Sequence, residues 1–261
     1  MPDRLTARRR KEIASLARKK HRERLGQMLI EGVRSVEAAV AAGAPLVDLV
    51  VTEAAWEDAR VQALVNAVEV PVYVVPGQDV ARLSDVQANQ GLLAVARPRR
   101  LAEAQLATLH TILALDGVQD PGNVGTLIRT AAWFGTDAVL AGPGTADVFN
   151  PKVVRAAMGG LWDVHMAQTG DLGACLAGLQ QHGFACYGAD LQGTPVAAWA
   201  PRRPSVLVLG SEAHGLSPDV RAHLDERVAV TGASRRVGTE SLNVAVAAGI
   251  LVYQWLGEAS S

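Results

Sequence analysis

From Thr111 onward, short apolar segments of strand length alternate with longer segments that have helical periodicity. Strands are expected at 112–115, 138–140, 164–167, 184–187, 205–209 and 228–230, and helices at 123–134, 151–158, 172–182 and 220–224. Strictly alternating strands and helices form a parallel sheet with helices on both faces. The predicted fold class is therefore α/β, and ligands of such sheets bind at the carboxyl ends of the strands.

The first hundred residues show a second, shorter alternation. Strands are expected at 28–32, 46–51, 71–75 and 91–96, and helices at 33–42 and 53–65. The sequence Arg97-Pro98-Arg99-Arg100 that follows has the composition of a linker. We therefore predict a small α/β domain at 1–100, a linker at 101–109 and a larger domain at 110–261. Nearly half of all residues are hydrophobic, which is enough to give both domains a core.

Cysteine usage and hydropathy indicate the compartment. Cys175 and Cys186 match no paired metal-ligand spacing, and two thiols in so long a chain indicate a reducing environment. The N-terminus is charged, and no run approaches the roughly eighteen apolar residues of a membrane span. We expect a cytoplasmic protein that needs no metal.

Positive charge is concentrated at the N-terminus. Residues 1–25 carry a net charge of +7 and the whole chain −1, so the remainder sums to −8. This segment is either a solvated basic helix or a binding site for a polyanion. Because so many cations repel one another unless they are neutralised, we favour nucleic acid. The residues assigned to RNA contact are Arg8, Arg9, Arg10, Lys19, Lys20 and Arg22.

Three strand ends in the larger domain carry unusual residues, and the first follows residue 115. Asp120-Pro121-Gly122 predicts a turn, and Asn123 can cap the helix that carries Arg129. Two interpretations are equally supported: the glycines allow close packing and Arg129 pairs with a surface carboxylate, or the loop, helix terminus and Arg129 hold a phosphate.

The second unusual strand end is Gly210 to Ser217, after a fully apolar strand. Gly210 is expected to let the flat ring of a ligand approach the backbone. Glu212 is expected to orient a hydrogen-bond donor or to pair with Arg129. His214 is interpreted as an exposed loop residue, because no second histidine or carboxylate stands beside it at ligand or triad spacing.

The third unusual segment, 238–243, leads into an apolar helix. Ser241 or Thr239 is the expected N-cap. Apolar residues lie on both sides of this helix, so one side is expected against the core and the other against a second subunit. One stripe consists of Leu242, Ala245, Val246, Gly249, Ile250 and Tyr253.

Two enzyme classes lack their fingerprints in this sequence. No GxGxxG follows a strand, which counts against a nicotinamide-dependent oxidoreductase, and no GxxxxGK[ST] is present, which counts against an ATPase.

Taken together, the three segments resemble the SpoU (TrmH-like) branch of the SPOUT RNA 2′-O-ribose methyltransferases. The family patterns DPGNxGxxxRTA, LxxGxExxGL and ESLNVxVAxGI match residues 120–131, 207–216 and 240–250, in this order. Residues 150–159 are similar to a fourth family segment, with Ala157 where many relatives have Ser. The segments 29–32 and 90–95 resemble the family's accessory substrate-binding domain, which is a small ribosomal-protein-like α/β domain.

The resemblance implies a C-terminal domain with a deep trefoil knot, an exception to the rule that chains do not thread loops. It implies an obligate homodimer and a bound S-adenosyl-L-methionine, with cofactor contacts at Leu209, Gly210, Val230 and Leu242. The stretch between Val230 and Leu242 is longer than is usual in the family, and Thr231 stands where relatives often have Pro.

The resemblance also assigns Arg129 to the attacking ribose 2′-hydroxyl, with Asn123, Glu212, Ser241 and Asn243 shaping the catalytic site. A guanidinium is almost never deprotonated, so Arg129 is expected to bind the adjacent phosphate and to stabilise the developing alkoxide. Large-subunit (23S) ribosomal RNA is the preferred substrate. A tRNA methyltransferase and a non-catalytic RNA-binding or assembly factor of the same fold are the alternatives.

Overall fold

The computed structural model describes residues 4–84, 90–233, 238 and 240–257. The chain divides into two compact units. Unit 1 comprises Met1–Arg99 with Phe149–Trp162, and unit 2 comprises Arg100–Val148 with Asp163–Ser261. The segment Phe149–Trp162 thus lies inside the span of the larger predicted domain but packs with unit 1.

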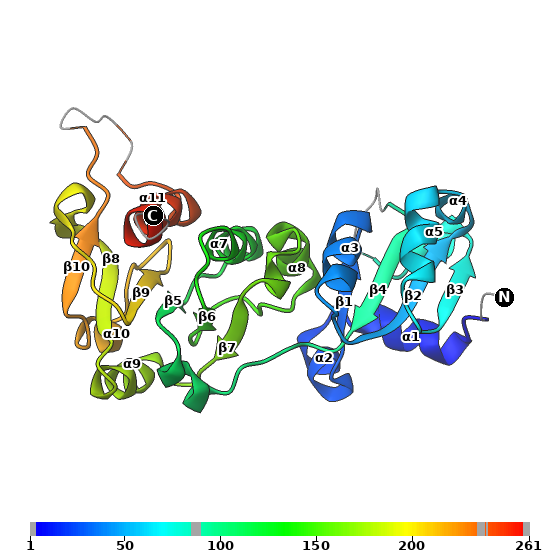
Figure 1. Ribbon diagram of the computed structural model, residues 1–261, viewed down its shortest axis with the longest axis horizontal. Coiled ribbons are helices and arrows are strands. Elements are labelled where there is room, and N and C mark those ends of the chain that lie inside the picture. Colours follow the sequence, from blue (N-terminus) through cyan, green and yellow to red (C-terminus); the bar gives the residue numbers. More distant parts are fainter. Residues whose placement is uncertain (1–3, 85–89, 234–237, 239, 258–261) are drawn as a thin grey trace. The chain divides into compact units, whose positions relative to one another are not determined.

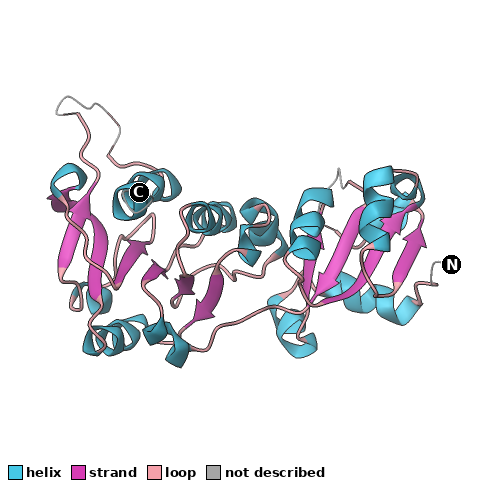
Figure 2. Cartoon of the chain, in the orientation of Figure 1, coloured by secondary structure: helices cyan, strands magenta, loops and turns pink. Residues whose placement is uncertain are grey.

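Unit 1 is built on a four-stranded mixed sheet with the order β1-β4-β2-β3 (Figure 2). Its strands are β1 (Met28–Glu31), β2 (Leu46–Thr52), β3 (Val72–Val75) and β4 (Leu92–Ala96), of which only β2 and β3 pair in parallel. Its helices are α1 (Ala7–Ser15), α2 (Lys19–Leu25), α3 (Val33–Ala41), α4 (Glu53–Trp56), α5 (Ala59–Asn66), α6 (Gly77–Ala81) and α8 (Pro151–Ala157), with the 3-10 turn η2 (Gly160–Trp162).

The core of unit 1 shows why its first two helices form. Ile13 and Leu16, at the end of α1, are fully buried against strand residues such as Leu29 and Val50. The basic segment is therefore a structural part of the domain. The single helix expected at 53–65 is wrong, because the Asp58 carboxylate accepts a hydrogen bond from the Arg60 amide and caps a separate helix, α5.

Unit 2 contains a six-stranded sheet with the order β10-β8-β9-β5-β6-β7, in which every strand pair is parallel. This confirms the predicted parallel α/β sheet. Its strands are β5 (Thr111–Asp116), β6 (Ala138–Ala141), β7 (His165–Gln168), β8 (Ala185–Pro195), β9 (Ser205–Gly210) and β10 (Glu226–Ala229). Its helices are α7 (Pro121–Trp133), α9 (Leu172–Gln181), α10 (Pro218–Arg221) and α11 (Val244–Leu256), with 3-10 turns η1 (Glu103–Thr108) and η3 (Val196–Ala198).

Helices cover both faces of the unit 2 sheet (Figure 1). On one face α7 and α11 pack against each other and against the sheet. On the other face α9, α10 and η1 close a core in which Ile112, Leu140 and Val206 are fully buried. Cys175 and Cys186 lie in this core as free thiols, and burial raises the pKa of both to about 12, so they stay protonated.

Both helix caps predicted next to the motifs are wrong by two or three residues. Asp120, not Asn123, caps α7, since its carboxylate accepts from the Asn123 amide at 2.8 Å. Asn243, not Ser241, caps α11, and Thr239 lies outside the described residues. Because Asp120 caps α7, the Asn123 side chain is free to form hydrogen bonds elsewhere.

No helix in the described part of the chain is long and apolar enough to span a membrane.

Candidate active site

The three motif loops meet through a chain of side-chain hydrogen bonds in unit 2. Asn123, in the first turn of α7, donates from Nδ2 to Oε1 of Glu212 at 2.7 Å. Asn243 donates from Nδ2 to Oδ1 of Asn123 at 3.0 Å. The Oδ1 atom of Asn243 accepts from the amides of Ala245 and Val246 at the start of α11. Asn123 thus ties the loop after β9 to the N-terminus of α11.

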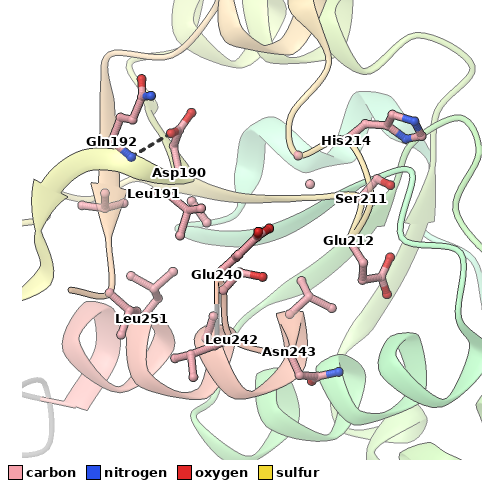
Figure 3. A pocket seen from close by; sticks show the side chains of 18 of the residues that line it. Asp190, Leu191, Gln192, Ser211, Glu212, His214, Glu240, Leu242, Asn243 and Leu251 are labelled. Carbon is pink, nitrogen blue, oxygen red and sulfur yellow. Dashed lines mark hydrogen bonds between the residues drawn. The ribbon is translucent and has the colours of Figure 1, made fainter. Parts of the chain in front are cut away.

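A cavity of 790 Å³ lies beside this network. Figure 3 shows its walls: Asp190 to Gln192 at the end of β8, Ser211 to His214 after β9, and Glu240 to Asn243 leading into α11. Val228, Val230, Leu242 and Leu251 add apolar surface. The volume falls in the range of about 300–1,000 Å³ that is typical of small-molecule sites. The cavity lies at the carboxyl ends of parallel strands, where the fold class predicts a ligand.

The cavity can hold S-adenosyl-L-methionine. Its apolar residues offer surface for the adenine ring. The carboxylates of Glu212 and Glu240 lie around the same space and suit a ligand with a sulfonium and an ammonium group. No group of three or more metal-ligating side chains is present among the described residues.

Gly210 lines the cavity, and the geometry of the following loop gives it a further role there. A Cβ at this position would lie 2.3 Å from the backbone carbonyl carbon of Gly215. Ser211 and Gly215 exchange two backbone hydrogen bonds, of 3.0 and 2.8 Å, which fold the loop back over Gly210. Gly210 therefore allows the loop to close on itself.

Replacement of Gly210 by alanine is therefore expected to push the 211–215 loop outward. Overpacking against backbone atoms costs about 1–3 kcal/mol, and the loop carries Glu212, so we expect a lower melting temperature and a weaker affinity for S-adenosyl-L-methionine. Differential scanning fluorimetry with and without the cofactor measures both. The matched control is Gly178→Ala on α9, where a Cβ meets nothing within 4 Å. Equal behaviour of the two variants would contradict the assigned role.

The other predicted site residues divide into two groups. Val230, Ser241 and Leu242 line the cavity with Gly210 and Glu212, whereas Leu209 is fully buried in β9 and does not. Arg129 is exposed on α7 and does not line the cavity either. Glu212 hydrogen-bonds to Asn123 and not to Arg129, and the Arg129 side chain is exposed.

Sequence reasoning missed the wall formed by β8. The predicted strand stopped at residue 187, but β8 continues to Pro195 and places Asp190 and Gln192 in the cavity. Asp190 forms an ion pair with Arg221 at 3.0 Å. The rule that ligands bind at the carboxyl ends of parallel strands would have directed attention to Asp190 if the strand had been extended.

The basic residues of unit 1 are neutralised to a large extent by the protein itself. Arg9 pairs with Asp48 and Glu12, and Arg10 pairs with Asp79. Burial raises the pKa of the Asp48 carboxyl although Arg9 lies against it. Arg22 is only 5% exposed and donates to the carbonyl oxygens of Leu16 and Ala17.

Because the protein itself neutralises several of these cations, their mutual repulsion does not require a polyanion along the whole of residues 1–25. Arg8, Lys19 and Lys20 keep exposed side chains, although Arg8 lies 3.1 Å from Glu12 and Lys19 3.9 Å from Glu23.

Comparison with protein families gives two matches that follow one another along the chain. Residues 110–253 match the model of the SpoU rRNA Methylase family. Residues 8–94 match the model of the MRM3-like substrate binding domain.

Individual proteins resemble the chain over nearly its whole length. The 23S rRNA (guanosine(2553)-2′-O)-methyltransferase RlmP of Bacillus subtilis is 32% identical over 248 residues, which cover 95% of each chain. The structure of a TrmH-family protein from Porphyromonas gingivalis superposes with a TM-score of 0.84 and 36% identity, covering 97% of this chain and 98% of the other. The AdoMet-bound rRNA methyltransferase of Sinorhizobium meliloti gives a TM-score of 0.83 and 25% identity, covering 100% and 98%.

Proposed function

The chain belongs to the SpoU rRNA Methylase family, and from that premise we propose that it transfers the methyl group of S-adenosyl-L-methionine to a ribose 2′-hydroxyl of 23S ribosomal RNA. The observation that carries the proposal is the convergence of the three motif loops on the Asn123–Glu212–Asn243 network beside a 790 Å³ cavity. Segments 89 and 120 residues apart meet at these hydrogen bonds.

The chemistry required of the chain is mainly positioning. The transfer forms a bond between the ribose oxygen and the methyl carbon, breaks the bond from that carbon to sulfur, and releases the hydroxyl proton. Holding the hydroxyl in line with the methyl group supplies most of the acceleration. Because its guanidinium stays protonated, Arg129 binds the neighbouring phosphate and stabilises the developing alkoxide. Asn123, Glu212, Ser241 and Asn243 hold the loops between cofactor and ribose.

Ribosomal RNA is favoured as the substrate class by two features. The chain has a separate unit of about the same extent as the MRM3-like substrate binding domain, and this unit presents exposed cations such as Arg8, Lys19 and Lys20. RlmP of Bacillus subtilis, to which the chain is similar over 95% of its length, carries 23S rRNA in its name. A substrate of this kind would place the protein in the cytoplasm.

We also propose a homodimer formed through α7 and α11. Trp133 is 84% exposed on α7, and Val246, Ile250 and Tyr253 form an exposed apolar stripe on α11. The two helices pack against each other, and the Phe134 and Tyr253 rings touch edge to face with centroids 6.1 Å apart. Leu242 extends the stripe toward the cavity. A contiguous apolar face of this kind is typical of a subunit interface, and twofold symmetry would bring two copies of it together.

The deciding experiment is transfer of labelled methyl from S-adenosyl-L-methionine to unmodified 23S ribosomal RNA and, separately, to bulk tRNA. A 2′-O-methylated ribose resists alkaline cleavage, so one alkali-resistant labelled position in 23S RNA is the expected result. Label in tRNA alone would overturn the choice of 23S RNA as the substrate. Absence of label from both RNAs and from ribosomal particles, with cofactor binding absent by calorimetry, would favour the non-catalytic alternative.

A further inference from the structure

Three charged side chains, Asp190, Arg221 and Arg227, meet beside the cavity of unit 2. Oδ2 of Asp190 lies 3.0 Å from Nη1 of Arg221 and 3.6 Å from Nη1 of Arg227. The Asp190 side chain is only 7% exposed, so the two guanidiniums share one buried carboxylate. Neither arginine forms another ion pair with a described residue. Two positive charges against one negative charge leave this cluster with a net charge of +1.

Of the two arginines, only Arg221 lines the cavity. Its Nε donates to the carbonyl oxygen of Leu216 at 3.1 Å, and its Nη1 contacts Asp190. These two contacts hold the guanidinium in place. Its Nη2 has no hydrogen-bond partner in the part of the chain that the structure describes, and the side chain is 43% exposed. The planar fork of Arg221 is therefore fixed and keeps donors for a ligand.

The other walls of the cavity carry the opposite charge. Glu212 and Glu240 line it together with Arg221, and among the described residues no other lysine or arginine does. Figure 3 shows Asp190, the ion-pair partner of Arg221, on the side of the cavity away from Glu212. The cavity thus offers a cationic wall and an acidic wall. A ligand with both a negative and a positive group matches this arrangement better than a simple anion or cation.

S-adenosyl-L-methionine carries both kinds of group. Its sulfonium and ammonium are positive and suit the acidic wall, whereas its α-carboxylate is negative. A guanidinium and a carboxylate form short, charge-assisted hydrogen bonds, often two at once. A phosphate of the RNA is the other anion that suits Arg221. The carboxylate is preferred because Arg221 lines the same cavity as the apolar residues Val230 and Leu242, so that one small ligand can contact all three.

We propose that Arg221 binds the α-carboxylate of S-adenosyl-L-methionine. Asp190 acts as a positioning residue, because it holds the Arg221 guanidinium at the wall of the cavity, and Arg227 adds to the neutralisation of its buried charge. Arg221 thereby makes the site selective for a cofactor that has an intact amino-acid end. The inference rests on the proposed function, since it takes this cavity to be the cofactor site of a methyltransferase.

The test is calorimetric titration of the full-length protein with S-adenosyl-L-methionine and with decarboxylated S-adenosylmethionine, which lacks only the carboxylate. The wild type is expected to bind the decarboxylated ligand about tenfold more weakly, the lower end of what hydrogen bonds between charged groups contribute, because Arg221 is partly exposed. Arg221→Ala is expected to lose this preference and to bind both ligands alike. Arg221→Lys keeps the charge but not the planar fork, so it should retain part of the preference.

Arg227→Ala is the matched control, because Arg227 contacts the same Asp190 oxygen and is also 43% exposed but does not line the cavity. It should keep the wild-type preference. Each protein is judged by the ratio of its two affinities, and a general loss of stability weakens both affinities and leaves the ratio unchanged.

An Arg221→Ala protein with the same preference as Arg227→Ala would overturn the inference. If that protein instead lost affinity for RNA, Arg221 would be a phosphate contact and the inference would equally be wrong. A wild type that transfers methyl groups but binds both ligands alike would sink only the inference. A wild type that binds neither ligand would sink the proposed function and the inference with it.

Discussion

Replacement of Arg129 by alanine is expected to lower methyl transfer about 10²- to 10³-fold, the usual cost of removing one donor that stabilises developing negative charge. The affinity for S-adenosyl-L-methionine should stay unchanged, because Arg129 lies on the exposed side of α7 and does not line the cavity of unit 2. Single-turnover kinetics with saturating RNA measure the first quantity and calorimetry the second.

Arg129→Lys separates charge from geometry. A lysine keeps the positive charge but loses the planar fork, so it should restore part of the rate lost in Arg129→Ala. Arg202→Ala, another exposed arginine, should behave as the wild type. Full turnover by Arg129→Ala would show that Arg129 takes no part in the reaction. A parallel loss of cofactor binding would show that Arg129 acts by maintaining the fold of unit 2.

Replacement of Val246 by glutamate is expected to convert the proposed dimer into a monomer. Val246 is 53% exposed in the middle of the apolar stripe on α11. In a twofold interface each substitution would bury two unpaired carboxylates, and an uncompensated buried charge costs about 3–5 kcal/mol. At about 1.4 kcal/mol for each factor of ten, even one such charge should raise the dissociation constant by a factor of about 10² to 10⁴. Sedimentation equilibrium should show the mass falling from twice 27.4 kDa to 27.4 kDa.

Leu191→Glu is the control for this experiment, since Leu191 is a large apolar residue that is exposed on β8, not on α7 or α11. It should remain dimeric. A wild-type protein that sediments as a monomer would rule out the dimer, and a Val246→Glu protein that stays dimeric would move the interface away from α11.

Much of the fold follows from local patterns in the sequence. The strands expected around 112–115, 138–140, 164–167 and 205–209 form as β5, β6, β7 and β9, and their pairing is parallel as predicted. Such agreement is expected because strand and helix periodicity is a property of neighbouring residues. The motif loops also lie where they were expected, because the ligand-binding loops of a parallel sheet follow the carboxyl ends of its strands.

The helix caps show where local reasoning is insufficient. Asp120 and Asn123 are both good capping residues, as are Ser241 and Asn243, and the sequence does not decide between neighbours of similar propensity. The structure selects Asp120 and Asn243. The choice matters, because it frees the Asn123 side chain to bond both Glu212 and Asn243.

The sequence by itself determined the α/β class, the position of the three motif loops and, through their resemblance to known enzymes, the family. Only the tertiary structure decided which side chains meet: Glu212 hydrogen-bonds to Asn123 and not to Arg129, and Arg22 lies buried inside unit 1. Local patterns fix backbone conformation, whereas hydrogen-bond partners and burial depend on residues that are distant in the chain, such as Asn123 and Asn243, and become neighbours only when it folds.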